Sequence, residues 1–167
     1  MNNIKKAVMG GVAGATMLAS TLMPVLAAKP NPSADNGLMM NGQSEVRHLE
    51  LYQKDPSTLE IVASGARGKM TFDLDSFIFN GKGLEAGVEY SLIYYPDPWP
   101  GTNLVVLGEG TANSGGNVNI KGEFDFSNLP DGAKIWLVLS EDVDIEAPTK
   151  MIGWHPDQYL FEYDVIN

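Results

Sequence analysis

The chain has 167 residues, carries no cysteine and has a formal net charge of −10 at pH 7. Without disulfides, its stability has to come from a hydrophobic core, or else from bound ions or assembly. An acidic surface repels phosphate backbones and anionic lipids, so the composition argues against nucleic acid as a partner. It suits solubility, divalent cations or basic partners instead.

Residues 1–27 have the pattern of a secretory signal peptide. Lys5 and Lys6 form a basic start, a stretch of small and apolar residues runs from Ala7 to Leu22, and Val25-Leu26-Ala27 ends the segment. Small or aliphatic residues at the last and third-last positions are what signal peptidase recognises. We expect cleavage after Ala27 and a mature protein that is secreted or held at the cell surface, with no membrane span left after cleavage.

Residues 28–44 are rich in Pro, Asn, Ser, Gly and Met and show no hydrophobic period. This composition predicts a flexible or extended leader. We expect the fold to occupy residues 45–167 as one domain, because the remaining length is typical of a single hydrophobic core.

Beyond the leader, apolar and polar residues alternate in short runs that are separated by Gly, Pro, Asn and Asp. This spacing predicts an all-β fold, an antiparallel β-sandwich of seven to nine strands. The hydrophobic register slips at Ser76, which indicates a bulge or bend at that residue. The expected strands are Arg47–Gln53, Glu60–Ala63, Met70–Phe79 with its slip, Val88–Tyr95, Leu104–Ala112, Val118–Phe126, Ile135–Leu139 and Tyr159–Val165.

Two of these strands carry unusual patterns. Ile135–Leu139 is apolar on both faces, so we expect a central strand whose second face is covered by a loop, the leader or another subunit. In the last strand, alternation places Tyr159 and Phe161 inward and Leu160 and Glu162 outward.

Several segments resemble uncharacterised secreted or surface β-sandwich domains of archaeal and bacterial proteins. The resemblance covers residues 49–143 and rests most on the segment from Tyr90 to Gly101, YSLIYYPDPWPG, with support from GARGKM at 65–70 and AKIWLVLS at 133–140. It implies an immunoglobulin-like extracellular module. It implies no activity, and it assigns no functional residue.

The acidic run from Glu141 to Glu146 suggests a metal site. Asp142, Asp144 and Glu146 alternate where a strand runs into a loop, and oxygen ligands with this spacing can converge on Ca²⁺. The run lacks the glycine and the distal glutamate of a helix-loop-helix calcium site, and alternate acids are also typical of the solvent face of an edge strand.

The aromatic residues Tyr95, Trp99 and Trp154 suggest a ligand-binding platform, because exposed indole and phenol rings stack on the faces of sugars. The alternative is structural: Trp99, which lies between two prolines, could fold back and close the end of the core.

No nucleophile elbow, zinc-protease helix, phosphate loop or dinucleotide motif occurs, and a pair of catalytic carboxylates cannot be selected among so many acids. We therefore expect a non-enzymatic module with a structural, assembly or adhesive role, whose partner would be a second copy in a homo-oligomer or polymer, or a surface glycan or protein. The alternatives are a soluble carbohydrate- or protein-binding module that uses the aromatics near Trp99, and a secreted hydrolase.

Overall fold

The computed structural model describes residues 46–129 and 133–163. The expected signal peptide and leader lie outside the described residues. In the described part of the chain, no helix has the length and apolar character needed to cross a bilayer.

The expected all-β antiparallel architecture is confirmed. Eight strands form one antiparallel sheet in the order β5-β4-β7-β10-β1-β2-β3-β6, and β8 pairs with β9 in a small second sheet. Two short 3₁₀ helices, η1 at Phe126–Asn128 and η2 at Ser140–Asp142, flank β7. The strands are β1 (Arg47–Tyr52), β2 (Arg67–Phe72), β3 (Ser76–Lys82), β4 (Glu89–Tyr95), β5 (Val105–Thr111), β6 (Val118–Glu123), β7 (Lys134–Leu139), β8 (Val143–Asp144), β9 (Lys150–Met151) and β10 (Leu160–Glu162).

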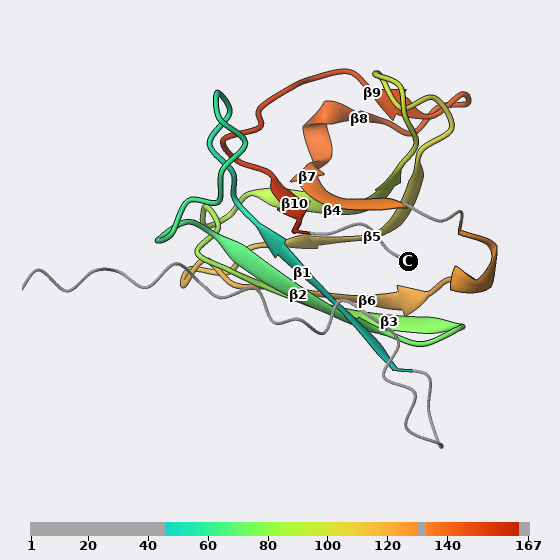
Figure 1. The fold of residues 1–167 in the computed structure, drawn as a ribbon, viewed down its shortest axis with the longest axis horizontal. Helices are drawn as coiled ribbons and strands as arrows, with labels where there is room; N and C mark the ends of the chain where they lie inside the picture. Colours follow the sequence, from blue (N-terminus) through green and yellow to red (C-terminus); the bar gives the residue numbers. More distant parts are fainter. Residues whose placement is uncertain (1–45, 130–132, 164–167) are drawn as a thin grey trace, which may run out of the picture.

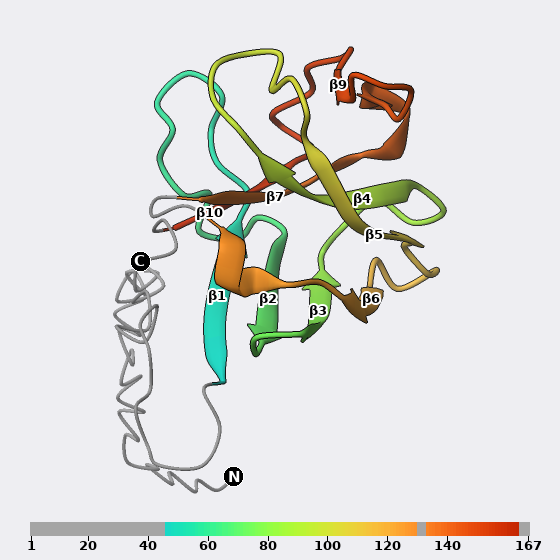
Figure 2. The same cartoon turned by 90° about the vertical axis from the view of Figure 1, so that its right-hand side faces the viewer.

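The main sheet curls until it is nearly a barrel, so the two layers of the expected sandwich are halves of one sheet. One layer holds β1, β2, β3 and β6, and the other holds β4, β5, β7 and β10 (Figures 1 and 2). The edge strands β5 and β6 approach closely through glycines. A Cβ atom on Gly108 would lie 2.7 Å from Ile120 Cγ2, and one on Gly110 would lie 2.9 Å from Val118 Cγ2. Side chains at these two positions would push the edges apart.

The hydrophobic core lies between the two layers and is aligned by the strand register. In one layer, Leu49, Met70, Phe79 and Ile120 lie opposite one another on neighbouring strands, and all are buried. In the other layer, the fully buried residues Leu160, Leu137 and Leu92 lie opposite one another on β10, β7 and β4. The period-two pattern of the sequence therefore fills the interior, as the hydrophobic alternation predicts.

The second apolar face of β7 is covered by a later segment of the same chain. Trp136 and Val138 point away from the core and are 8% and 0% exposed. The segment from Ser140 to Tyr159, which contains η2, β8 and β9, lies over the outer side of the layer that contains β7 (Figure 1). The sequence left a loop, the leader or another subunit as the element that covers this face, and the structure shows a loop of the same chain. We call residues 140–159 the covering segment.

Two sequence expectations on individual strands are wrong. The register slip at Ser76 is a tight turn between β2 and β3, because the Asp73 side chain accepts hydrogen bonds from the backbone N–H groups of Asp75 and Ser76. Residues 60–63 form no strand. They contribute one isolated bridge, between Ile61 and Lys54.

The last strand is buried on both faces, so the expected outward position of Leu160 and Glu162 is wrong as well. Glu162 is 8% exposed, and its Oε2 atom has no hydrogen-bond partner. Burial raises the pKa of this carboxyl to about 7, although the charges of Lys54 and Lys134 act in the opposite direction. Near neutral pH the fold therefore holds a carboxyl group that is partly protonated.

This burial makes stability depend on pH. The folded-state pKa of Glu162 is raised, so its stabilising effect is complete below the unfolded value near 4.5 and is lost as the pH rises through about 7. Relative to Glu162→Gln, the wild-type protein should lose about 3 kcal/mol of unfolding free energy between pH 4.5 and pH 8. Urea unfolding at both pH values measures this difference. The exposed-site variant Glu60→Gln should show the same change in unfolding free energy between the two pH values as the wild type. An equal change in wild type and Glu162→Gln would contradict the raised pKa of Glu162.

Candidate functional site

The structure brings Tyr95, Trp99 and Trp154 together at one pocket on the outer side of the layer that contains β4 and β7. The pocket has a volume of about 550 Å³ and is also lined by Trp136 and Asp97. These residues come from the end of β4, the turn that follows it, the start of β7 and the covering segment. The three aromatic residues singled out from the sequence therefore share a site, which Trp136 enlarges.

Two stacked rings form the floor of the pocket. Tyr95 and Trp136 lie on the neighbouring strands β4 and β7, with ring centroids 3.9 Å apart and planes inclined by 12°. They are 3% and 8% exposed, respectively. Phe161 of β10 packs against Trp136 edge-on at 5.2 Å, so the floor is fixed from both sides by the sheet.

Two indoles form the exposed wall. Trp99 and Trp154 are 50% and 48% exposed and meet edge-to-face, with centroids 5.3 Å apart. Trp99 therefore does not close the end of the core, which was the structural alternative for this residue. Both rings present large apolar surfaces to solvent beside a rigid floor.

The turn that carries Trp99 is held by backbone contacts. The Gly101 N–H donates to the Pro98 carbonyl, and the Met151 N–H of β9 donates to the Pro100 carbonyl. Both N···O distances are 2.8 Å. Gly101 has a φ of +71°, and a Cβ atom there would lie 2.4 Å from the Tyr95 ring. Glycine is therefore required at this position for the turn to lie against the pocket floor.

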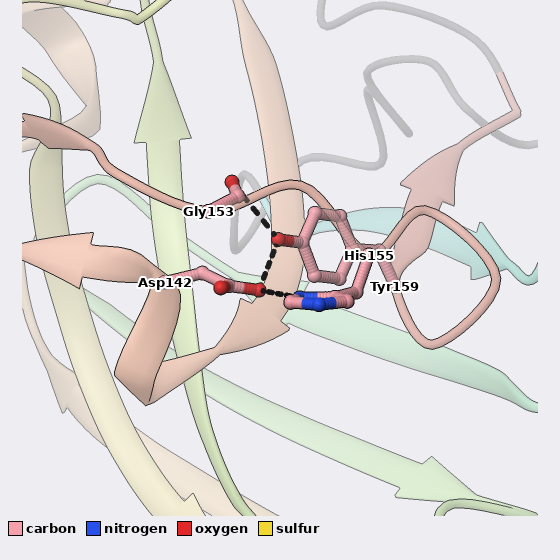
Figure 3. Close-up of polar contacts among 4 residues, drawn as sticks. All are labelled: Asp142, Gly153, His155 and Tyr159. Carbon is pink, nitrogen blue, oxygen red and sulfur yellow. Dashed lines mark hydrogen bonds and ion pairs between the residues drawn. The ribbon is translucent and has the colours of Figure 1, made fainter.

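The segment that carries Trp154 is held by a buried carboxylate. Asp142 is 4% exposed, and its Oδ2 atom accepts a hydrogen bond from the Tyr159 hydroxyl and lies 2.8 Å from His155 Nδ1 (Figure 3). Gly153 fits against the same carboxylate, where any side chain would collide with Oδ1. Trp154 lies between Gly153 and His155 and packs edge-on against Tyr159 at 5.6 Å.

The Asp142 carboxylate also sets the protonation of its neighbours. Its hydrogen bond and its negative charge raise the pKa of His155 above the usual value. Burial, followed by the hydrogen bond to Asp142, raises the pKa of Tyr159 well above its usual value, so the hydroxyl stays protonated and remains a donor. A chain of charge and hydrogen bonds thus fixes the backbone on both sides of Trp154.

One acidic side chain lines the pocket within the described residues. Asp97 is exposed at the rim and pairs with Lys134 Nζ. Retaining or inverting glycoside hydrolysis needs two carboxyl groups on either side of the scissile bond. The pocket offers apolar stacking surfaces with one charged pair at its edge, which suits binding and orientation of a ligand.

The three residues singled out for calcium do not form a metal site in the described part of the chain. Asp142 is turned inward to Tyr159 and His155, while Asp144 pairs with Lys150 at 3.5 Å and accepts a hydrogen bond from the Glu146 N–H. Across residues 46–129 and 133–163, no group of three His, Cys, Asp or Glu residues is placed to hold a metal ion. The structure therefore does not bring this set of oxygens together.

Sequence reasoning missed three parts of the site: Trp136 in the floor, the Asp97–Lys134 pair at the rim, and the Asp142–Tyr159 anchor. Trp136 carried a signal, since it lies in a strand that is apolar on both faces. No sequence pattern indicated the anchor, because Asp142 and Tyr159 are 17 residues apart in the chain.

No protein-family model, curated protein or solved structure matches this chain. The resemblance to surface β-sandwich domains stays a prediction.

The anchor predicts a specific stability loss. Tyr159→Phe removes the hydroxyl donor from the buried Asp142 carboxylate, which should lower the free energy of unfolding by about 1–3 kcal/mol. Tyr163→Phe, in which the lost hydroxyl belongs to a half-exposed ring, should change it by less than about 0.5 kcal/mol. Urea unfolding measures both. Equal effects of the two substitutions would show that the Asp142–Tyr159 bond does not hold the covering segment.

Proposed function

We propose that this protein is a non-enzymatic, exported carbohydrate-binding module whose ligand stacks in the aromatic pocket. The observation that carries the proposal is the pairing of two half-exposed indoles, Trp99 and Trp154, with a floor of stacked aromatic rings. Large exposed aromatics are costly for a soluble protein, and their fixation around a pocket supports a binding role.

The composition of the pocket suits a sugar ring. The C–H faces of a pyranose are apolar and stack on indole, while the ring hydroxyls need polar partners at the edge. Asp97 and Lys134 offer an acceptor and a donor at the rim. The volume of about 550 Å³ lies within the usual range of small-ligand sites, about 300–1,000 Å³.

A hydrolase is less well supported. Acid–base catalysis at a glycosidic bond needs a second carboxyl group near the first, and Asp97 is the one acid among the described lining residues. This carboxylate is already paired with Lys134 Nζ at the rim.

A role in assembly by strand addition also has less support. Strand addition needs a free sheet edge. Here the edge strands β5 and β6 approach each other closely at Gly108 and Gly110, which leaves this part of both edges little room for a strand from a second copy.

The proposal predicts measurable binding of neutral oligosaccharides. Isothermal titration with cellotetraose, chitotetraose and mannotetraose should detect binding of at least one. Trp99→Ala should weaken it about fivefold or more, because stacking on an aromatic side chain contributes about 1–3 kcal/mol. Trp99→Phe, which keeps an aromatic ring, should retain most of the affinity.

Leu74→Ala is the matched control, since Leu74 is a 44% exposed apolar residue in the β2–β3 turn, away from the pocket. It should bind like the wild type. Absence of binding for all three oligosaccharides, or equal affinities of Trp99→Ala and wild type, would contradict the proposal.

Export is tested separately. In a secreting bacterial host, the protein recovered outside the cytoplasm should begin at Ala28, as read by N-terminal sequencing and intact mass. Ala27→Phe places a bulky residue at the cleavage position and should leave the chain unprocessed or cut elsewhere. Recovery of the wild-type chain with residues 1–27 still attached would contradict cleavage at this site.

A further inference from the structure

A second hollow lies in the other layer of the barrel, on the outer side of β1, β2, β3 and β6. It has a volume of about 670 Å³, and its lining comes from these strands and from the turn between β5 and β6. The aromatic pocket lies on the outer side of the opposite layer, so the two sites share no lining residue.

The hollow is basic although the chain is acidic. Arg67, Lys69 and Lys82 line it, together with one acid, Glu50, whose carboxylate lies 3.8 Å from Lys69 Nζ. Among the described residues, Arg67 and Lys82 therefore have no neutralising partner inside the hollow, on a chain whose net charge is −10.

The strand register forces these two cations together. Arg67 of β2 lies directly opposite Lys82 of β3, and both side chains are exposed. Like charges directly opposite in a sheet destabilise it. No described carboxylate forms an ion pair with either residue. A bound anion would relieve this repulsion.

Amide groups continue the same surface. Asn80 lies opposite Asn119 and accepts a hydrogen bond of 2.7 Å from its side chain, which leaves the Asn80 NH₂ group and the Asn119 oxygen available to a ligand. Asn113 and Asn117 line the hollow from the β5–β6 turn, and the buried Tyr52 ring borders it. The cations and amides together match the carboxylates and hydroxyls of an acidic sugar.

We propose that this hollow binds a short oligosaccharide that contains uronic acid. The planar guanidinium of Arg67 pairs with the ligand carboxylate, Lys82 adds a second positive charge, and Asn80 and Asn119 bind ring hydroxyls. The site is independent of the aromatic pocket and does not rest on its proposed function.

Charge and polarity favour this ligand over larger partners. A stable protein interface has an apolar centre and buries more than about 1,000 Å², whereas exposed amides and cations dominate this hollow. A long polyanion would meet the repulsion of the acidic remainder of the chain, while a short acidic oligosaccharide contacts the basic hollow alone.

Isothermal titration with trigalacturonate tests the proposal, with its fully methyl-esterified form as the neutral match. The wild-type protein should bind the acid more tightly than the ester. The acid should bind less tightly as salt rises from 20 to 300 mM, because the pairing is electrostatic and exposed. Arg67→Gln with Lys82→Gln should weaken binding at least tenfold. The control variant Lys121→Gln with Lys150→Gln removes the same amount of charge outside the hollow. Its affinity for trigalacturonate should stay within twofold of the wild-type value.

Thermal unfolding gives a readout that does not depend on the ligand. Since Arg67 and Lys82 repel each other, the Arg67→Gln/Lys82→Gln variant should melt at the same temperature as the wild type or higher, which also shows that it folds. A lower melting temperature would contradict the repulsion on which the site is argued.

Three binding results would overturn the proposal. They are no binding of trigalacturonate, equal loss of affinity in both double variants, and tighter binding of a sulfated disaccharide than of the uronate. Light scattering completes the test, because a dimer that dissociates on Arg67→Gln/Lys82→Gln substitution would identify a second copy as the occupant instead.

Discussion

The architecture depends on one constraint: β7 is apolar on both faces, so the chain has to cover both. One face joins the barrel core through Leu137 and its neighbours, and the other presents Trp136 and Val138 outward. Burial of a side chain the size of Trp136 is worth roughly 2–3 kcal/mol, a large share of the stability of a domain without disulfides. The covering segment supplies this burial, and the aromatic pocket lies where the cover meets the turn after β4.

The cover needs its own fixation, because two-residue strands such as β8 and β9 contribute few ladder hydrogen bonds. The buried Asp142 carboxylate provides it by binding the side chains of His155 and Tyr159, which follow Trp154 in the chain. A buried charge is stabilising only when it is well hydrogen-bonded, so the same group makes the loop sensitive to loss of any one partner. A rigid loop in turn reduces the ordering cost of ligand binding, which links the stability of the cover to the quality of the pocket.

Hydrophobic alternation predicted β1, β4, β5, β6 and β7 well, because it reports burial on one or both faces of a strand. It failed at Ser76, where the Asp73 side chain forms a turn that needs no glycine or proline. It also failed at Glu162, because polarity alone does not show that a strand is buried on both faces. The aromatic composition correctly suggested that Tyr95, Trp99 and Trp154 belong to one site. The acidic run, in contrast, wrongly suggested a metal site. The true partners of Asp142, His155 and Tyr159, lie 13 and 17 residues further along the chain, where a local pattern does not reveal them.

The two proposed ligand sites differ in chemistry, because they lie on the outer faces of opposite layers of the sheet. In our proposals, the aromatic pocket binds apolar ring faces, an interaction that salt leaves almost unchanged, whereas Arg67 and Lys82 act through exposed charges that are screened within about 8–10 Å at physiological salt. A near-barrel can carry both because its core joins the two layers, while the hollows on their outer faces share no lining residue. On this proposal, the acidic remainder of the chain adds to the specificity of the basic hollow, because it repels extended polyanions more than short acidic ligands.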